Sequence, residues 1–188
     1  MTRIRTIAAL TVVGALALPS AAFAALKVTG GNTQITASSA ATTTMSANHL
    51  SVTPLAPATA SGSTFTFPIS GGRLGKKHLH GTIAQRGGFT ISNGTRDVTV
   101  RRLRLVSTGH GVWLFAFISK PRLATAAHRP MSMRRVGHLT GVNVKNGSAT
   151  GKLRLTAFSA GGINALAGKH IARAGTPLGT ITVTPSFG

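Results

Sequence analysis

Acidic side chains are almost missing from this sequence: Asp97 is the single carboxylate residue among 188 residues, against 21 lysines and arginines. Paired carboxylates for general acid–base catalysis are therefore excluded, and so are oxygen-rich cages for calcium or magnesium. A serine hydrolase would need Asp97 to orient a distant histidine, and the chain has no G-x-S-x-G motif. We therefore expect that the protein is not an enzyme.

Cysteine is absent altogether, which excludes disulfides, thiolate metal sites and a lipid anchor on an N-terminal cysteine. A long apolar run is missing as well. The apolar run at residues 7–18 is too short for a permanent membrane anchor, which needs about 20 residues. The chain therefore folds without disulfides or thiolate-bound metal.

The first 24 residues have the pattern of a secretory signal peptide. Arg3 and Arg5 form a positive head before the apolar run, and Ala22-Phe23-Ala24 supplies small residues for cleavage. We expect residues 1–24 to be removed and residues 25–188 to form a single domain. The predicted location is secreted, extracellular or associated with the cell wall, with no transmembrane anchor after cleavage.

Hydrophobic periodicity indicates β-structure. Residues 152–157 and 180–184 alternate apolar and polar side chains, and Asn93-Gly94 and Asn146-Gly147 separate pairs of such runs. Asn-Gly favours tight hairpin turns. We predict an all-β protein, an antiparallel β-sandwich, with a shared core to which six residues contribute: Trp113, Phe115, Leu153, Leu155, Ile181 and Val183.

Two predicted strands depart from simple alternation. Residues 112–118 are apolar on both faces, which predicts a strand that is covered on both sides or crosses the core. Near Arg101-Arg102 the alternation changes phase, because Val98 and Val100 are followed by Leu103 and Leu105. A β-bulge at the two arginines would explain this change.

Helix is scarce, and its two candidates, residues 38–48 and 159–168, belong to an internal echo. In each copy a Thr-Ala segment precedes the helix, and a histidine (His49 or His170) and a Thr-Pro-Leu follow it. This pattern predicts strand, short helix and strand twice, as in a pseudo-duplication. Chance similarity of Ala/Ser/Thr-rich segments is the alternative.

Residues 62–72 (GSTFTFPISGG), 81–89 (GTIAQRGGF) and 98–106 resemble a pattern of exported bacterial proteins. The nearest named relative is the haem-transport-associated (Htaa) domain. This resemblance implies a secreted or envelope-bound β-sandwich that takes part in haem acquisition. The motifs consist mainly of turn glycines and strand residues, so they bear on the fold more than on the activity.

The chain departs from this family at the iron. Haem-binding Htaa domains ligate iron with a tyrosine, and this chain has none. A histidine would have to replace it, and His110 beside Trp113 is the candidate; an ordinary turn histidine is the alternative. In an extended segment, His78 and His80 would lie on one face, a geometry in which two imidazoles can bind zinc or copper. The neighbouring Lys76-Lys77 would repel a cation and favours a solvated basic edge instead.

Positive charge is what the sequence has in excess, with 14 arginines and 7 lysines. Arginine favours bidentate contact with phosphate or carboxylate. A predominance of one charge predicts binding to polyanions, including non-specific nucleic acid at low salt. The candidate polyanion-binding residues are Arg101, Arg102, Arg104, Arg73, Lys76 and Lys77.

Two function classes follow. The first is a basic, non-enzymatic protein that holds anionic cell-wall or surface polymers and needs no cofactor. The alternative is an Htaa-like protein that binds or transports a small ligand, haem. The basic composition could also reflect a genome rich in arginine codons, in which case the charge has no partner.

Overall fold

The computed structural model describes residues 25–75, 80–119, 122–123 and 131–188. The expected signal peptide, residues 1–24, lies outside the described residues. In chain order the elements are β1 (Leu26–Ala37), α1 (Ser39–Ala47), β2 (Ser51–Leu55), β3 (Thr59–Ser61), β4 (Thr64–Leu74), β5 (Gly81–Gln85), β6 (Gly88–Ser92), β7 (Arg96–Thr108), β8 (Gly111–Ser119), β9 (Arg122–Leu123), β10 (Met131–Lys145), β11 (Ser148–Leu155), α2 (Ala157–Ala167) and β12 (Pro177–Phe187).

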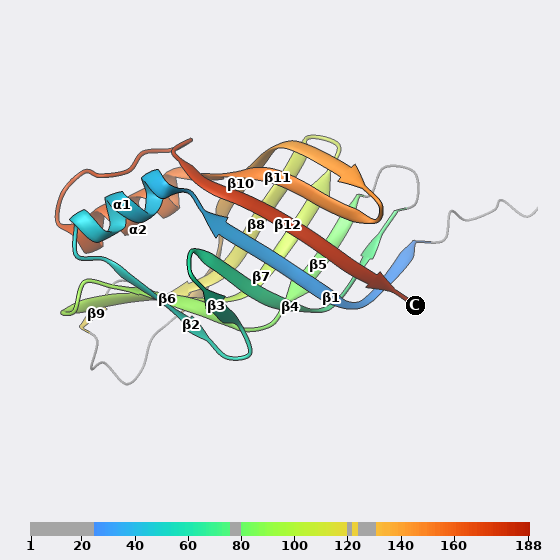
Figure 1. The fold of residues 1–188 in the computed structure, drawn as a ribbon, viewed down its shortest axis with the longest axis horizontal. Coiled ribbons are helices and arrows are strands. Elements are labelled where there is room, and N and C mark those ends of the chain that lie inside the picture. Colours follow the sequence, from blue (N-terminus) through green and yellow to red (C-terminus); the bar gives the residue numbers. More distant parts are fainter. Residues whose placement is uncertain (1–24, 76–79, 120–121, 124–130) are drawn as a thin grey trace, which may run out of the picture.

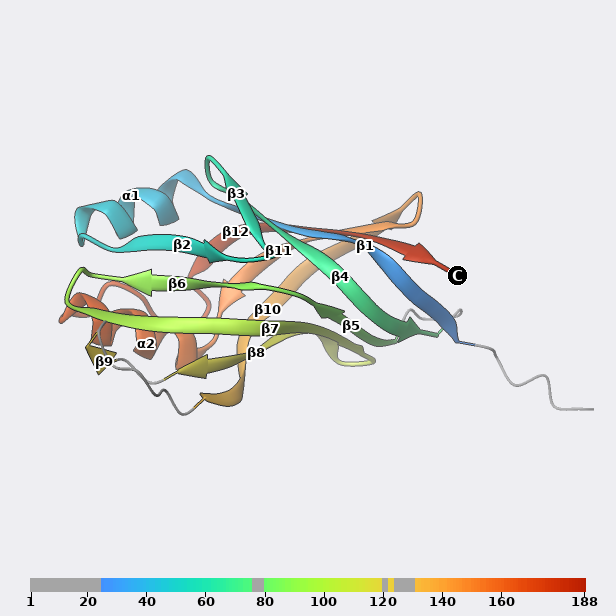
Figure 2. The same cartoon turned by 90° about the horizontal axis from the view of Figure 1, so that it is seen from below.

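Eight of the strands close into an antiparallel barrel. Around the barrel they follow the order β7, β5, β4, β1, β12, β11, β10 and β8, and β8 pairs back with β7. Strands β6 and β2 continue from the first half of β7 beyond the ring. The prediction of an all-β protein is confirmed, but the prediction of a sandwich is wrong, because one curved sheet closes on itself (Figures 1 and 2).

Bulges give this sheet its curvature. The pairing register shifts between Val28 and Gly30 in β1, between Ile69 and Gly71 in β4, and twice in β10. A bulge bends its strand and increases the local twist, so long strands such as the 15-residue β10 wrap around the core. Alternating side chains look alike in a sandwich and in a barrel, and the sequence pattern therefore did not separate the two.

The predicted bulge in β7 is present. Its register with β8 shifts between Arg101 and Arg104, and Arg102 has a φ of 51°. Val98 and Val100 before the bulge and Leu103 and Leu105 after it are all buried, so the extra residue keeps one apolar face inward. The bulge also divides β7 into a first part that pairs with β6 and a second part that pairs with β5.

Both predicted Asn-Gly hairpins are present. Asn146 and Gly147 have φ angles of 50° and 75° and join β10 to β11, with Lys145 opposite Ser148; two positive φ angles are the mark of a type I′ turn. At the other hairpin the Asn93 side chain accepts hydrogen bonds from the backbone N–H groups of Thr95 and Arg96, at 3.0 and 2.7 Å.

The core fills the barrel. Leu153, Leu155, Ile181 and Val183 are buried there, as predicted. Trp113 and Phe115 were expected in the same core, and this prediction is wrong, because the other face of β8 is buried and both rings are only half-buried on the outside. The inward set of β8 is Leu114, Ala116 and Ile118. The interior of a small barrel has limited room. These three side chains have a smaller volume than the aromatic side chains of the opposite face, which explains why they are the ones that point inward.

Both predicted helices form, and they lie at the same end of the barrel (Figures 1 and 2). Each begins at a hydroxyl N-cap: the Ser38 side chain accepts from the Ala41 N–H at 3.2 Å, and the Thr156 side chain accepts from the Ser159 N–H at 3.3 Å. Among the described residues, no helix is long and apolar enough to cross a membrane.

The predicted order of strand, helix and strand occurs in both copies of the echo, and His49 and His170 each follow a helix C-terminus. The strand pairing differs between the copies. Strand β2, which ends the first copy, pairs with β6, whereas β12, which ends the second, pairs with β1 and β11. The two copies therefore share an order of elements but not a pattern of strand pairing.

Candidate functional site

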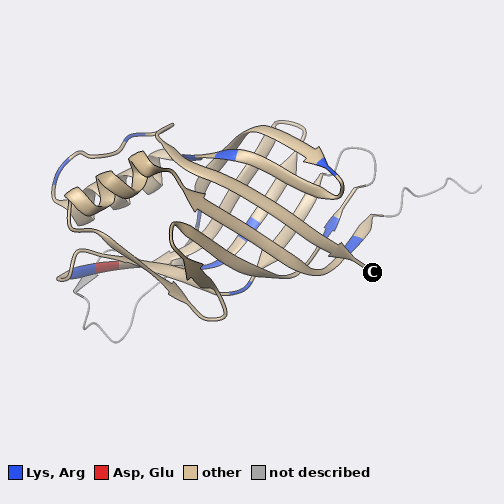
Figure 3. Ribbon diagram, in the orientation of Figure 1, with Lys and Arg blue, Asp and Glu red and all other residues tan. Residues whose placement is uncertain are grey.

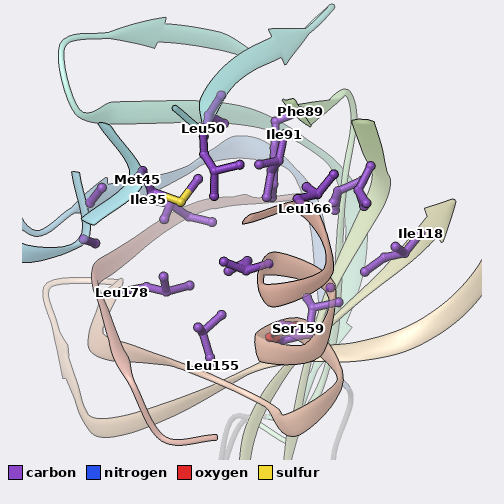
Figure 4. A pocket seen from close by; sticks show the side chains of 18 of the residues that line it. Ile35, Met45, Leu50, Phe89, Ile91, Ile118, Leu155, Ser159, Leu166 and Leu178 are labelled. Carbon is purple, nitrogen blue, oxygen red and sulfur yellow. Dashed lines mark hydrogen bonds between the residues drawn. The ribbon is translucent and has the colours of Figure 1, made fainter. Parts of the chain in front are cut away.

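A large apolar cavity lies at the end of the barrel that carries the two helices. Its volume is about 910 Å³, within the range of about 300–1,000 Å³ that is usual for small-molecule sites. Leu103, Leu114 and Phe67 line it on the barrel side, while residues of α1 and α2 line it on the helix side. Figure 4 shows side chains from α1, α2 and several strands directed toward the same space.

The cavity exists because the helices cover the barrel end without filling it. Helix α1 has no buried residue, whereas α2 buries Ala160, Ile163 and Leu166 against the strands. The side chain of Met45 packs at the edge of the core as part of the lining. The result is an apolar space that continues from the barrel core to the gap between the helices.

Two glycines in the middle of α2 enlarge this space. Gly161 and Gly162 both line the cavity, and a Cβ atom added at either would meet nothing within 4 Å. Glycine inside a helix costs roughly 0.5–1 kcal/mol relative to alanine, and no close contact within the protein requires it here. The pair leaves one side of α2 open to a molecule in the cavity.

Hydrogen bonds fix α2 in this position. The Asn93 side chain, from the turn between β6 and β7, donates to the Leu166 carbonyl at 2.8 Å. At the other end of the helix, the Ser159 hydroxyl donates to the Val136 carbonyl at 2.6 Å. The Asn164 side chain accepts from the N–H groups of Ile171 and Ala172, both at 2.9 Å. These bonds connect α2 to the β6–β7 turn, to β10 and to the segment that follows the helix, and so fix this wall of the cavity.

One charged side chain, Arg134, lies among the described residues that line the cavity. Its guanidinium lies 5.5 Å from the centre of the Phe158 ring, and its Nε donates to the Ser132 hydroxyl at 3.1 Å. Arg134 is exposed, and Phe158 is 45% exposed. An arginine beside an apolar cavity can pair with the carboxylate of an otherwise apolar ligand.

Haem is one ligand class against which this lining can be tested. The apolar walls suit a porphyrin, and Arg134 suits a propionate. The lining offers little to the iron. Tyrosine is absent from the chain, and the described lining includes no histidine or cysteine. The Met45 thioether is the one side chain in this lining of a type that ligates haem iron. The described residues therefore fit the macrocycle but do not fit its iron.

The histidines proposed from sequence lie away from this cavity. His110 lies exposed in the turn between β7 and β8, and Trp113 stacks on His138 instead, with ring centres 4.0 Å apart. His80 directly precedes β5, and its carbonyl accepts a hydrogen bond from the Gly75 N–H. His78 lies outside the described residues. In the described part of the chain, no three His, Cys, Asp or Glu residues group as metal ligands would.

The candidate polyanion-binding residues fall into two sets. Arg73 of β4 and Arg104 of β7 line one shallow groove of about 420 Å³ on the outside of the barrel, with Gly71, Gly72, Thr82 and Ala84. Arg101 and Arg102 lie exposed at the bulge, where the Arg102 guanidinium is 5.9 Å from the Phe117 ring centre. Lys76 and Lys77 lie outside the described residues.

The register of the strands extends this groove into a wider surface, which we call the basic outer face. It consists of two rows of residues that run across β4, β5, β7, β8 and β10. From β4 to β10 the first row is Gly71, Ala84, Arg104, Phe115 and Arg135, and the second row is Arg73, Thr82, Val106, Trp113 and His138.

Sequence reasoning missed Arg135 as part of this surface. It follows Arg134 directly in the sequence, and successive side chains of a strand point to opposite faces, so Arg134, opposite the buried Ala116, lines the cavity while Arg135, opposite Phe115, lies on the outside. The sequence also separated the aromatic residues from the basic clusters, whereas here they alternate. Figure 3 shows basic residues spread over the strands and the single acidic residue at the start of β7.

Comparison with known proteins gives a fold and no close relative. No family model matches the sequence, and no curated protein matches it. Among solved structures, the C-terminal domain of HtaA from Corynebacterium glutamicum superposes with a TM-score of 0.65 at 18% identity, over 87% of this chain and 99% of that one. The haem-binding protein HtaB from the same organism gives 0.60 at 14%, over 88% and 96%.

The N-terminal domain of HtaA gives a TM-score of 0.58 at 17% identity, over 83% of this chain and 97% of that one. These identities are low, so the comparisons bear on the backbone and not on individual site residues. The resemblance noted in the sequence is confirmed at that level: this chain has the fold of the HtaA and HtaB domains.

Proposed function

We propose that this protein is a non-enzymatic binding protein whose cavity holds an apolar, planar ligand of the haem class. The observation that carries this proposal is the cavity of about 910 Å³, with apolar walls from the barrel and both helices and one arginine in its lining. The likeness in fold to a haem-binding protein supports the same ligand class. The signal-like segment at residues 1–24 favours action outside the cell.

Binding in this cavity would draw on two interactions. Burial of apolar ligand surface against side chains such as Leu103, Phe67 and Leu155 contributes about 25 cal/mol per Å² of surface removed from water, before the cost of association is subtracted. Arg134 adds a charge-assisted hydrogen bond to a propionate. Recognition rests on the macrocycle and its carboxylate, because the described lining offers the iron nothing stronger than a thioether.

The test is a comparison of two ligands that differ only in the metal. The purified protein is titrated with haemin and with metal-free protoporphyrin IX, and absorbance in the Soret region reports binding. We expect both to bind, with dissociation constants within about tenfold of each other, a difference of about 1.4 kcal/mol. Absence of binding by both porphyrins would overturn the proposal. Much tighter binding of haemin than of protoporphyrin IX would show that the protein recognises the iron, and it would overturn the claim that recognition rests on the macrocycle.

A substitution that fills the cavity locates the site. Gly162→Leu places a side chain where the structure has open space, so it should lower the affinity for both porphyrins. Ala47→Leu is the matched control, because Ala47 is an exposed residue of α1 outside the lining. Equal affinities of the two variants would place the ligand elsewhere on the protein.

A further inference from the structure

We propose that the basic outer face binds an acidic polysaccharide through the carboxylates on its sugars. This surface is separate from the cavity, since its side chains point away from the barrel core. The inner neighbours of its residues, among them Leu105, Leu114 and Leu139, are buried, which leaves Arg104, Trp113 and His138 on the outside. The proposal therefore stands or falls independently of the cavity ligand.

Three arginines are spaced regularly over this face. Arg73, Arg104 and Arg135 lie on β4, β7 and β10, which are alternate strands in the barrel order. Neighbouring strands lie about 4.8 Å apart, so the backbones that carry these arginines are roughly 10 Å apart across the sheet. All three side chains are exposed. Arg104 and Arg135 lie in the first row and Arg73 in the second, so the face offers a guanidinium group on every other strand, as a chain with repeated anionic groups requires.

The groove between Arg73 and Arg104 has room for more than a bare anion. Its floor consists of residues with small side chains or none, and its volume is about 420 Å³. Gly71, which lies opposite Ala84 in the first row, has a φ of 146°, a conformation that residues with a side chain rarely adopt. Glycine at this position keeps the floor low between the two arginines, and the Thr82 hydroxyl adds a polar group. A sugar ring with its carboxylate fits this shape and chemistry.

Contacts within the protein position the third arginine. The Arg135 guanidinium lies 4.1 Å from the centre of the Trp113 ring and 5.6 Å from that of Phe115. These cation–π contacts hold the guanidinium against the surface although Arg135 as a residue is exposed. An arginine that is already placed loses less side-chain entropy when it binds a carboxylate.

The same contacts disfavour single-stranded nucleic acid as the partner. Proteins that bind it use open aromatic faces on which bases stack. The Trp113 ring is stacked on His138 at 4.0 Å with an interplanar angle of 21°, and the Arg135 guanidinium lies over it at 4.1 Å. With both groups within about 4 Å of its ring centre, Trp113 offers a base less open face than a stacking platform needs.

The test compares two variants that lose equal charge. The variant R73Q/R104Q/R135Q removes three arginines of the basic outer face, and K145Q/K169Q/R173Q removes three exposed basic residues elsewhere. Binding of polygalacturonate is measured at several salt concentrations. We expect the first variant to lose at least about tenfold in affinity at low salt, and its log–log salt slope to fall by roughly one for each arginine removed.

The control variant should lose less than about threefold. Similar losses in both variants would overturn the proposal and indicate diffuse attraction by the net charge of +20. Tighter binding of an oligothymidylate with the same number of charges would overturn the choice of a polysaccharide. Neutral dextran should not bind. Both variants should remain folded and bind protoporphyrin IX equally, which separates this surface from the cavity.

Discussion

The guanidinium of Arg135 and the indole of Trp113 form the closest cation–π contact among the described residues, with 4.1 Å between the guanidinium carbon and the ring centre. The two residues come from neighbouring strands, β10 and β8, on the outside of the barrel. This contact helps to explain how a large aromatic side chain can point outward, because Arg135 and His138 both pack against it. Because the contact involves the charged group of Arg135, removal of this charge should also reduce the packing of Trp113 on the outer face.

Replacing Trp113 with leucine tests this contact. The variant Trp113→Leu should lose about 1–2 kcal/mol of unfolding free energy from cation–π contacts and ring packing, measured by urea unfolding. Affinity for polygalacturonate should fall severalfold because Arg135 is no longer held in place. Trp113→Phe should recover part of both losses. Unchanged polymer affinity in Trp113→Leu would show that Arg135 needs no positioning.

Arg134 should affect the ligand of the cavity and not the polymer. The variant Arg134→Gln removes the charged side chain of the described lining, so affinity for protoporphyrin IX should fall by about tenfold through loss of a charge-assisted hydrogen bond. The dimethyl ester of the same porphyrin has no carboxylate and should bind both proteins equally. An equal loss for the ester would mean that Arg134 acts through the shape of the cavity.

The glycine pair in α2 predicts opposite effects on stability and binding. Gly162→Ala should raise the unfolding free energy by roughly 0.5–1 kcal/mol, because the added methyl group meets nothing within 4 Å. The same methyl group takes room from the ligand, so porphyrin affinity should decrease. Thermal unfolding and porphyrin titration measure the two effects. A destabilised Gly162→Ala would mean that glycine serves the fold at this position.

Phe67 should be among the most costly residues to truncate. Its side chain is fully buried in the barrel and packs edge-on against Phe89, with ring centres 6.3 Å apart. Phe67→Ala should lower the unfolding free energy by about 3–5 kcal/mol, as measured by denaturant titration. The nearby Phe65→Ala, at a half-buried position, is the comparison and should cost less.

Added salt should stabilise the free protein. With a net charge of +20, like charges repel in the folded state, and salt screens them over a Debye length of about 8 Å at physiological ionic strength. The melting temperature should therefore rise between about 0.01 and 0.15 M salt, while polygalacturonate affinity falls over the same range. A melting temperature that decreases with salt would show that attractive contacts outweigh the repulsion.

Local structure was predictable because local residues determine it. Asn146-Gly147 indicated a hairpin turn, the change of phase at Arg101-Arg102 indicated a bulge, and the Ala/Ser-rich residues 38–48 indicated a short helix. Each of these features depends on a few neighbouring side chains and on backbone angles that those side chains favour.

Closure of the barrel and the two surfaces depend on residues that are distant in sequence. In β8 both faces are apolar, so the pattern could not tell whether Trp113 or Leu114 faces the core. Arg73 and Arg104 line the same groove only because their strands, β4 and β7, pair with opposite sides of β5. The cavity is a space that the helices leave unfilled, and no side-chain pattern marks such a space.

Closure of the ring also bears on how the protein avoids aggregation. Each strand of the ring is paired with a neighbour on both sides over at least part of its length, so among the described residues the ring has no free edge strand to offer another chain. Strand β2 lies at the end of the sheet path and carries Pro54, which has no N–H to offer a further strand. Protection against edge-to-edge association is therefore built into the topology, and it should persist at salt concentrations that screen the positive charge.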